Sequence, residues 1–526
     1  MTKKNPPLKL ASAGAARALD GEASRSWGLN PFALVEAAGR GCAQAFMTAF
    51  PGFFADPPSP LRITAAAGSG NNGADAMVLL RALIYRGVLR ADLAAVVINR
   101  IPGREDHNPR SEAERSLRAL GVSSLSWEDG GEGEARDTLA RSDIIIDGIS
   151  GTGLKGSKLP GPLGGISAEM AGFINTLAEA EEHPFILAID VPSGASDDWE
   201  EGMPLIRADA TAAIEPRKAM LYTPAIRPFA GTLVPVEEIF PAPLLDSIEG
   251  PELLDWEQVH PRLGKIKKDA YKQKRGMVKI RGGSPGFPGA PGIAARGAQA
   301  AGAGLVRLIV DDELYPILAA RAGGIMVEPA SLNEDSPWGD ALLLGPGWGT
   351  GADRTALLQR AWEREAAGLP LVLDADAISP SRDRVFHGRA ILTPHPGECA
   401  AFTGLPKEKI LARPLPILTR LAREKQAVFL FKSHVLFIAA PDGRVGVIDG
   451  MNPVLAAGGS GDLLAGICAA LAARMVQAGR FDGYTCAVTA AALLTEAGRQ
   501  AQAAREFSDP MELADRVARI AGAAWL

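Results

Sequence analysis

Short apolar runs alternate with amphipathic segments along most of this chain. Four runs in the first half, at 61–67, 93–98, 144–147 and 185–190, are apolar at nearly every position. Such runs are typical of strands buried on both faces, and the segments between them have the spacing of helices. Residues 8–50 precede the first run and also have helical spacing. The pattern predicts a helical lead-in followed by a parallel sheet built from βαβ units.

A change of composition near the middle of the chain interrupts this alternation. A proline-rich stretch at 240–243 is followed by an acidic segment at 246–255, and stretches of this kind are where domain boundaries fall. We therefore divide the chain into a first domain, 1–248, and a second domain, 249–526. The second domain has further apolar runs at 277–280, 305–310, 341–344, 371–374, 390–392, 427–431 and 435–438. These runs predict a second α/β sheet.

Composition and charge narrow the class of protein. The 526 residues are 47% hydrophobic and 22% charged, with a net charge of -6, so nothing favours nucleic acid as a partner. The four cysteines form no Cys-x-x-Cys pair, and neither a disulfide framework nor a zinc site is indicated. No apolar run is long enough to span a membrane. We expect a cytoplasmic, homo-oligomeric protein whose partners are small molecules.

The loop Gly-Gly-Ser-Gly-Asp at 458–462 is the strongest candidate for chemistry. It precedes a small apolar run at 463–473 that predicts a buried helix. The N–H groups of Gly459, Ser460 and Gly461 at this helix start suit a phosphate, because the helix dipole adds partial positive charge. A carboxylate beside a phosphate is useful as a base, so we interpret Asp462 as a base aimed at a hydroxyl. The alternative is a helix N-terminus with an acidic first turn.

Glycine-rich and polar loops also follow the strands predicted in the first domain. They lie at 68–73, 151–153 and 192–194. Ligands bind beyond the carboxyl ends of parallel strands, so these three loops are expected to line one pocket. Asn71 and Asn72 before a glycine would otherwise predict a simple turn.

The second domain resembles the ribokinase-like superfamily and, within it, the ADP/ATP-dependent NAD(P)H-hydrate dehydratases. Five motifs carry the resemblance in family order: Gly-Gly-Ser at 282–284 with Gly-Ala at 289–290, Gly-Pro-Gly at 345–347, Leu-Asp-Ala-Asp-Ala at 373–377, Thr-Pro-His-Pro-Gly-Glu at 393–398, and the glycine loop through 466. The resemblance implies that a nucleotide phosphorylates the C6 hydroxyl of the hydrated nicotinamide ring. It assigns the removal of the hydroxyl proton to Asp462.

The resemblance also divides the predicted pocket between two ligands. Positions facing the hydrate are Ala290, Gly347, His395 and Asp462. Positions facing ADP or ATP, which Mg²⁺ would accompany, are Lys432, Ser433, His434, Val435, Leu436, Gly459, Ser460 and Gly461. Two structural alternatives stay open: His395 could satisfy a loop carbonyl, and Asp374 and Asp376 could cap the following helix.

The first domain resembles the NAD(P)H-hydrate epimerases. The residues that carry this resemblance are Gly-Asn-Asn-Gly at 70–73 followed by Asp75, Asp147 with Gly-Thr-Gly-Leu at 151–154, Ala-Ile-Asp-Val-Pro-Ser-Gly at 188–194, Ala-Asp at 208–209, and Pro-Arg-Lys at 216–218. Ala74 and Ala76 stand where the family usually has glycine.

The epimerase resemblance implies a role for each of these positions. Asp190 is the acid/base carboxylate. Asn72, Asp147 and Ser193 match ligands of a monovalent cation, K⁺. Contacts with the dinucleotide fall on Asn71, Asn72, Gly73, Ala74, Asp75, Gly151, Thr152, Gly153, Leu154 and Asp190.

Fused in this order, the two domains resemble the bifunctional NAD(P)H-hydrate repair enzymes. The expected substrates are NADH hydrate and NADPH hydrate. The competing hypothesis is a ribokinase-like kinase of a vitamin hydroxyl fused to a non-catalytic nucleotide-binding domain. A stable phosphorylated product would favour the kinase, whereas regenerated dihydronicotinamide with free phosphate would favour the dehydratase.

Overall fold

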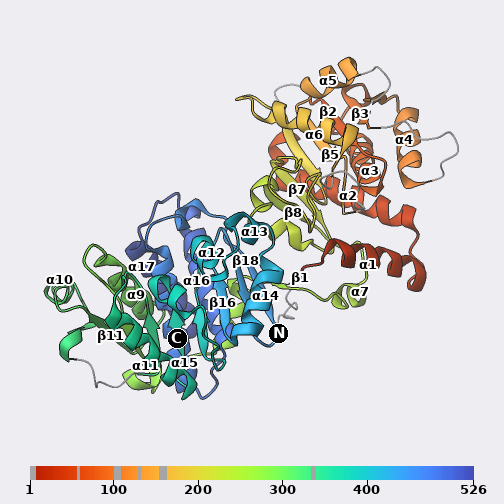
Figure 1. The fold of residues 1–526 in the computed structure, drawn as a ribbon. Helices are drawn as coiled ribbons and strands as arrows, with labels where there is room; N and C mark the ends of the chain where they lie inside the picture. The colour runs from red at the N-terminus through yellow and green to blue at the C-terminus, as the bar shows by residue number, and fades with distance from the viewer. Residues whose placement is uncertain (1–7, 56–59, 100–107, 128–131, 153–162, 333–338) are drawn as a thin grey trace. The chain divides into compact units, whose positions relative to one another are not determined.

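The chain forms two compact units, seen in a computed structural model that describes residues 8–55, 60–99, 108–127, 132–152, 163–332 and 339–526. The N-terminal unit is Lys9–Gly250, and the C-terminal unit contains Pro251–Leu526 together with Leu8 (Figure 1). Both units are α/β folds built on largely parallel sheets, as the apolar pattern predicts.

The N-terminal unit has a seven-stranded sheet in the order β4-β3-β2-β5-β6-β7-β8. Its strands are β2 (Ile63–Ala67), β3 (Ala94–Ile98), β4 (Ser123–Ser126), β5 (Ile144–Gly148), β6 (Phe185–Ile189), β7 (Ala210–Ile214) and β8 (Thr232–Val236). Its helices are α1 (Ala13–Ser26), α2 (Pro31–Ala49), α3 (Asn71–Tyr85), α4 (Pro109–Ala119), α5 (Glu132–Ala140), α6 (Gly165–Ala178) and α7 (Ala242–Asp246). All neighbouring strands are parallel.

Helices cover both faces of this sheet. Ile144 and Ile146 of β5 pack in one core with α2 and α3, while Ile145 between them packs in a second core with α5 and α6. Successive side chains of a strand point to opposite faces, so a continuous apolar run fills two cores at once. The result is a three-layer αβα unit.

The C-terminal unit is built on an eleven-stranded sheet in the order β1-β9-β18-β17-β16-β15-β14-β13-β10-β11-β12. Its strands are β1 (Leu8–Lys9), β9 (Glu252–Leu253), β10 (Met277–Arg281), β11 (Leu305–Val310), β12 (Met326–Pro329), β13 (Ala341–Leu344), β14 (Leu371–Leu373), β15 (Ala390–Leu392), β16 (Val428–Phe431), β17 (Val435–Ala439) and β18 (Val445–Asp449). Strands β10 to β16 are parallel, and β17 is antiparallel to both β16 and β18.

The helices of this unit are α8 (Trp256–Val259), α9 (Gly289–Ala300), α10 (Tyr315–Ala319), α11 (Ala352–Ala366), α12 (Pro396–Thr403), α13 (Lys407–Ala412), α14 (Pro414–Lys425), α15 (Ser460–Gln477), α16 (Gly483–Ala503) and α17 (Pro510–Trp525). Helices α9, α15, α16 and α17 share one core cluster with the sheet. Small residues bring α9 and α15 together: a Cβ on Gly466 would lie 1.9 Å from the carbonyl oxygen of Ala294, and a Cβ on Gly297 would lie 2.4 Å from that of Leu463. The position of α15, which begins at the predicted glycine loop, is fixed by this contact.

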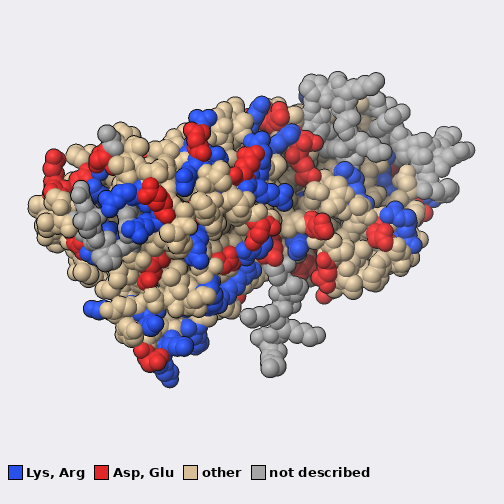
Figure 2. All heavy atoms as spheres, turned by 60° about the horizontal axis from the view of Figure 1, so that its bottom comes forward, with Lys and Arg blue, Asp and Glu red and all other residues tan. Residues whose placement is uncertain are grey.

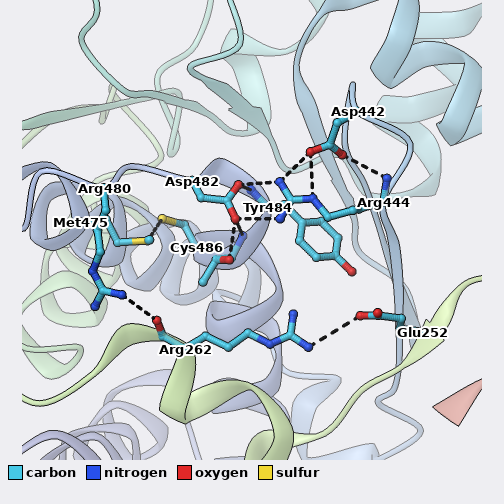
Figure 3. Close-up of polar contacts among 10 residues, drawn as sticks. Glu252, Arg262, Asp442, Arg444, Met475, Arg480, Asp482, Tyr484 and Cys486 are labelled. Carbon is cyan, nitrogen blue, oxygen red and sulfur yellow. Dashed lines mark hydrogen bonds and ion pairs between the residues drawn. The ribbon is translucent and has the colours of Figure 1, made fainter. Parts of the chain in front are cut away.

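A polar cluster joins the start of α16 to the turn between β17 and β18 (Figure 3). Asp482 is the N-cap of α16, and its carboxylate accepts hydrogen bonds from both terminal nitrogens of Arg444, at 2.8 and 2.9 Å. The guanidinium also lies 4.6 Å from the centre of the Tyr484 ring. Paired hydrogen bonds between arginine and a carboxylate hold a fixed geometry, so the cluster orients α16 against the sheet.

The surface carries charges of both signs. On the face drawn in Figure 2, Lys and Arg are interspersed with Asp and Glu. No helix in the part of the chain that the structure describes combines the length and apolar character needed to span a bilayer.

Candidate active sites

The N-terminal unit contains a cavity of about 670 Å³ at the carboxyl ends of its central strands. The chain runs from β2 outward through β3 and β4, and then returns to place β5 on the other side of β2. Such a switch point leaves a crevice where the loops diverge, and ligands of parallel α/β sheets bind there. The loops after β2 and β5 line the cavity, as predicted. Pro192, Ser193 and Gly194 do not, because Ser193 is fully buried behind the loop after β5.

The two asparagines begin α3 rather than forming the simple turn that was the alternative. Asn71, Asn72 and Asp75 line the cavity from the N-terminal end of this helix. A Cβ on Gly73 would lie 2.4 Å from the carbonyl oxygen of Gly68, so only glycine fits where the helix leaves the loop.

The two alanines beside Asp75 do not narrow the cavity. Ala74 and Ala76 are fully buried in the core shared with α2, and neither lines the cavity. Glycine at these positions is therefore not needed to keep the pocket open.

The three predicted cation ligands meet around one loop residue, Ser150. Asn72 donates from Nδ2 to the carbonyl oxygen of Ser150 at 3.0 Å, and Ser193 Oγ donates to the same oxygen at 3.1 Å. Ser193 Oγ also lies 2.5 Å from Asp147 Oδ1. Asp147 is fully buried, and burial raises its pKa to about 6. A buried carboxylate among hydroxyl, amide and carbonyl oxygens is a donor set that fits a hard cation.

Asp190 follows β6 and faces the cavity in a strained backbone conformation. Its φ is 66°, in the left-handed region that few residues other than glycine adopt. Its carboxylate lies 2.5 Å from Lys218 Nζ, and the lysine also donates to the carbonyl oxygen of Ile214 at 3.1 Å. Burial raises the pKa of Asp190, and the Lys218 ammonium opposes this rise. Both groups line the cavity.

Two residues of this site were not in the predicted set. Lys218 belongs to the Pro-Arg-Lys motif, but its spacing gave no reason to pair it with Asp190. Asp20 lines the same cavity from α1, and the pKa of its carboxyl is raised by burial and by Asp190. The only sequence signal for Asp20 is an acidic position in the helical lead-in.

The loop after β5 packs closely at Gly151 and is hydrogen-bonded at Thr152. A Cβ on Gly151 would lie 3.1 Å from the side chain of Asn72, so this glycine makes room for the asparagine. Arg17 of α1 donates to the carbonyl oxygen of Thr152. Gly153 and Leu154, predicted to contact the dinucleotide, lie outside the described residues.

In the C-terminal unit, four of the five predicted motifs follow β10, β13, β14 and β15, and the predicted nucleotide segment that begins at Lys432 follows β16. The carboxyl ends of these strands lie along one edge of the sheet. The motif after β10 contacts the motif after β13: Ser284 Oγ donates to the carbonyl oxygen of Gly347 at 3.0 Å. A Cβ on Gly347 would lie 3.1 Å from that of Ala290. Ala290 and Gly347, two of the four positions assigned to the hydrate, are therefore neighbours.

Asp462 lies in the first turn of α15, which begins at Ser460 rather than at the predicted position 463. Burial raises the pKa of its carboxyl to about 7, and Asp374 adds to the rise while Lys432 opposes it. A carboxylate with a pKa near neutrality can accept a proton at physiological pH and release it again.

Lys432 is the cationic centre of this site. Its Nζ lies 2.5 Å from Asp374 Oδ1 and 4.0 Å from Glu398 Oε2. Burial alone would lower the pKa of Lys432, but Asp374 and Glu398 outweigh it and raise the pKa. A Cβ on Gly461 would lie 3.3 Å from the same Nζ. The ammonium and the N-terminus of α15 are thus side by side, as an anion site requires.

The predicted caps and phosphate donors need two corrections. The side chains of Asp374 and Asp376 do not cap the following 3₁₀ turn: Asp374 bonds Lys432, and Asp376 accepts from the Gly349 N–H at 2.7 Å. The Ser460 N–H donates to the carbonyl oxygen of Ala457 at 3.2 Å, so it is occupied within the loop. The sequence instead predicted that this N–H points outward together with those of Gly459 and Gly461.

His395 caps α12 with its ring. Nδ1 accepts from the Gly397 N–H at 2.9 Å, and Nε2 lies 3.3 Å from Glu398 Oε1. The loop-carbonyl alternative is therefore wrong, because Nδ1 is an acceptor. Burial and Lys432 lower the pKa of His395, which keeps the ring neutral. Its side chain is 55% exposed and remains accessible.

The other residues assigned to the nucleotide lie in the turn between β16 and β17 and at the start of β17. Ser433 Oγ accepts from the Val435 N–H at 3.2 Å and shapes this turn. His434 is partly exposed within it. The side chains of Val435 and Leu436 are buried in β17, so these two residues can offer a ligand only their backbone.

Family models and known relatives match this chain. A family model described as NAD(P)H-hydrate dehydratase matches residues 278–519, and one described as YjeF-related protein N-terminus matches residues 31–219. A bifunctional NAD(P)H-hydrate repair enzyme of Moorella thermoacetica is 32% identical over 489 residues, which cover 88% of this chain and 87% of that protein. The enzyme of the same name from Salinibacter ruber is 30% identical, with 98% and 96% covered.

A solved structure matches the C-terminal unit. The ADP/ATP-dependent NAD(P)H-hydrate dehydratase of Bacillus subtilis, co-crystallised with ATP and Mg²⁺, is 25% identical with a TM-score of 0.45, covering 52% of this chain and 99% of that one.

Each of the two α/β units has, at the carboxyl edge of its sheet, a carboxyl whose pKa is raised by burial, which is typical of an enzyme site. The relatives and the matched family models identify the family of this enzyme. The chain belongs to the family of bifunctional NAD(P)H-hydrate repair enzymes.

Proposed function

We propose that this chain repairs hydrated NADH and NADPH with two activities. The first domain, 1–248, interconverts the R and S hydrates, and the second domain, 249–526, dehydrates the S hydrate in a reaction that uses ADP or ATP. The placement of Asp462 carries this proposal, because a carboxyl with a pKa of about 7 stands beside an ammonium and a helix N-terminus.

In the dehydratase site, Asp462 takes the proton from the C6 hydroxyl of the hydrate. Lys432 and the N–H groups at the start of α15 then stabilise the charge on the transferring phosphate. A bound nucleotide would supply the phosphoryl group that makes the hydroxyl a good leaving group, and Mg²⁺ would neutralise the nucleotide phosphates. Asp374 and Glu398, whose carboxylate oxygens lie 2.5 and 4.0 Å from Lys432 Nζ, are the residues that would hold this Mg²⁺.

In the epimerase site, Asp190 moves the proton that accompanies inversion at C6. Lys218 holds the Asp190 carboxylate in place. The K⁺ that we assign to Asn72, Asp147 and Ser193 would offset the buried charge of Asp147 and fix the loops after β2, β5 and β6 around the dinucleotide. The support for this assignment is the donor set around Ser150.

One assay tests the proposed function. The purified protein is given a mixture of NADH hydrate epimers with ADP or with ATP, and the absorbance of the reduced ring is followed. We expect nucleotide-dependent recovery of NADH with release of free phosphate. A stable phosphorylated product without NADH would instead establish the competing kinase function.

We predict that His395→Ala raises the KM for the hydrate more than the KM for the nucleotide. The ring is exposed beside Glu398, and its loss should cost about one hydrogen bond, or roughly 0.5–1.5 kcal/mol, equivalent to about a two- to tenfold change. Steady-state kinetics with each ligand varied in turn measures both constants.

His395→Asn is the matched control for helix capping. Asparagine can accept from the Gly397 N–H as the imidazole does, but it does not present a ring to the hydrate. We expect it to restore the stability of the C-terminal unit without restoring the KM for the hydrate. A change confined to the KM for the nucleotide would show that the pocket is divided differently.

A further inference from the structure

Asp75 is a second buried carboxyl that faces the epimerase cavity. It lies near the start of α3, is 7% exposed, and lines the same cavity as Asp190. Its Oδ1 has no hydrogen-bond partner among the described residues. A buried polar atom without a partner lowers stability, so such an atom beside a ligand cavity calls for a functional explanation.

The charges around Asp75 determine its protonation. Asp20 faces it from α1, the Cys42 thiol from α2, and Asp190 and Lys218 from the loops after β6 and β7. Burial raises the pKa of Asp75 well above its usual value, and Asp190 and Asp20 raise it further.

The one ammonium of this group contacts Asp190 directly, at 2.5 Å. Two neighbouring carboxyls in one site do not readily ionise together, and the one paired with the cation ionises first. Asp75 is therefore the carboxyl that holds a proton while Asp190 is ionised.

Epimerisation at C6 needs a proton donor on one face of the ring and a proton acceptor on the other. The C6 carbon carries a hydroxyl and the ring nitrogen, so inversion can proceed by loss of the hydroxyl and addition of water to the other face. The departing oxygen must receive a proton, and the incoming water must lose one. The two transfers take place on opposite faces of the ring, so one carboxyl fixed on a single face cannot perform both.

We propose that Asp75 is a second catalytic residue of the epimerase, acting as the acid while Asp190 acts as the base. This inference rests on the proposed epimerase function. The lone pair of the ring nitrogen forms a C6–N double bond as the C6–O bond breaks, and the oxygen leaves as water with the Asp75 proton. Water then adds to the opposite face, the double-bond electrons return to nitrogen, and Asp190 takes the proton released.

After one inversion the proton has moved from Asp75 to Asp190. The reverse reaction, starting from the other epimer, uses the two carboxyls in exchanged roles. Transfer of the proton back to Asp75 restores the starting state. A pair of this kind serves both directions of an equilibrium between epimers.

The test is Asp75→Asn in the full-length protein. Asparagine keeps the size and neutrality of a protonated carboxyl but cannot release the proton. We expect epimerisation of the R hydrate to slow by at least about 100-fold, the usual scale for losing an acid/base group. Dehydration of the S hydrate by the C-terminal unit should be unchanged. Chromatography of the two epimers measures the first rate, and NADH absorbance measures the second.

The pH profile separates catalysis from structure. Epimerisation by the unmodified protein should have a bell-shaped kcat/KM profile, falling in acid as Asp190 is protonated and in alkali as Asp75 ionises. The residual activity of Asp75→Asn should lack the alkaline limb. Asp143→Asn is the matched control, because Asp143 precedes β5 at the opposite end of the sheet and accepts from the Arg62 N–H at 2.7 Å. It should keep the rate and both limbs.

Two results would overturn this inference while leaving the proposed epimerase function intact. One is an unchanged epimerisation rate in Asp75→Asn. The other is a pH profile of kcat/KM for the unmodified protein that has no alkaline limb. The second of these needs no variant and applies even if Asp75→Asn fails to fold. An unmodified protein that does not accelerate epimerisation at all would overturn the proposed epimerase function, and this inference with it.

Discussion

Asp462→Asn is expected to lower the turnover of the dehydratase by about two to four orders of magnitude while leaving the C-terminal unit folded. The expected size is that of losing a general base. Asparagine has nearly the same shape as aspartate, and the first turn of α15 does not depend on this side chain for its cap. Recovery of NADH from the S hydrate at saturating nucleotide measures the effect, and thermal unfolding checks the fold.

The same assignment predicts a pH dependence. Because the pKa of Asp462 is raised to about 7, its base form is lost as the pH falls through neutrality, and the rate of dehydration should decline below about pH 7. Asp442→Asn is a suitable control, since Asp442 lies in the turn after β17, at the end of that strand away from Lys432. It should retain full activity. Unchanged turnover in Asp462→Asn would exclude the base assignment.

Asp190→Ala is expected to abolish epimerisation while leaving dehydration intact. With this variant and a nucleotide, the S hydrate should disappear rapidly. The R hydrate should disappear only as fast as it epimerises spontaneously in buffer. Removing the carboxylate deletes the proton acceptor and the partner of the buried Lys218. Chromatographic separation of the epimers over time distinguishes the two phases.

Asp190→Asn is a second variant that does not leave Lys218 without a neighbouring oxygen. It should show the same slow phase with less effect on the stability of the N-terminal unit. If the unmodified protein already consumes the R hydrate at the spontaneous rate, the N-terminal unit is not an epimerase.

The strands that could be predicted are those with continuous aliphatic runs. β11, for example, was predicted at 305–310 and occupies Leu305–Val310. Two of the missed strands lack that signal for physical reasons: β4 is Ser-Ser-Leu-Ser, and β8 contains Pro235. Both lie at the edges of the sheet, where a strand pairs on one side only and tolerates polar residues or proline.

The site residues that directly follow strands could be predicted from the sequence. Parallel strands bring their carboxyl ends to one edge, so the convergence of Asn72, Asp147 and Asp190 followed from the pattern of apolar runs. Lys218 and Asp20 could not be placed in this way, because their contacts join segments far apart in the sequence. The capping role of His395 did have a local signal, since a glutamate three residues later is the mark of a capping box.

The left-handed backbone at Asp190 has a consequence for protein engineering. Such a conformation in a residue other than glycine costs about 1–3 kcal/mol, and glycine adopts it without that penalty. Replacement of Asp190 alone by glycine would leave the buried Lys218 ammonium without its partner, and breaking a buried ion pair from one side costs about 3–5 kcal/mol. Selection of this enzyme for heat resistance alone would therefore favour loss of Asp190 and Lys218 together, and with them loss of the chemistry assigned to the N-terminal unit. A useful selection must require turnover of the R hydrate as well as survival of the fold.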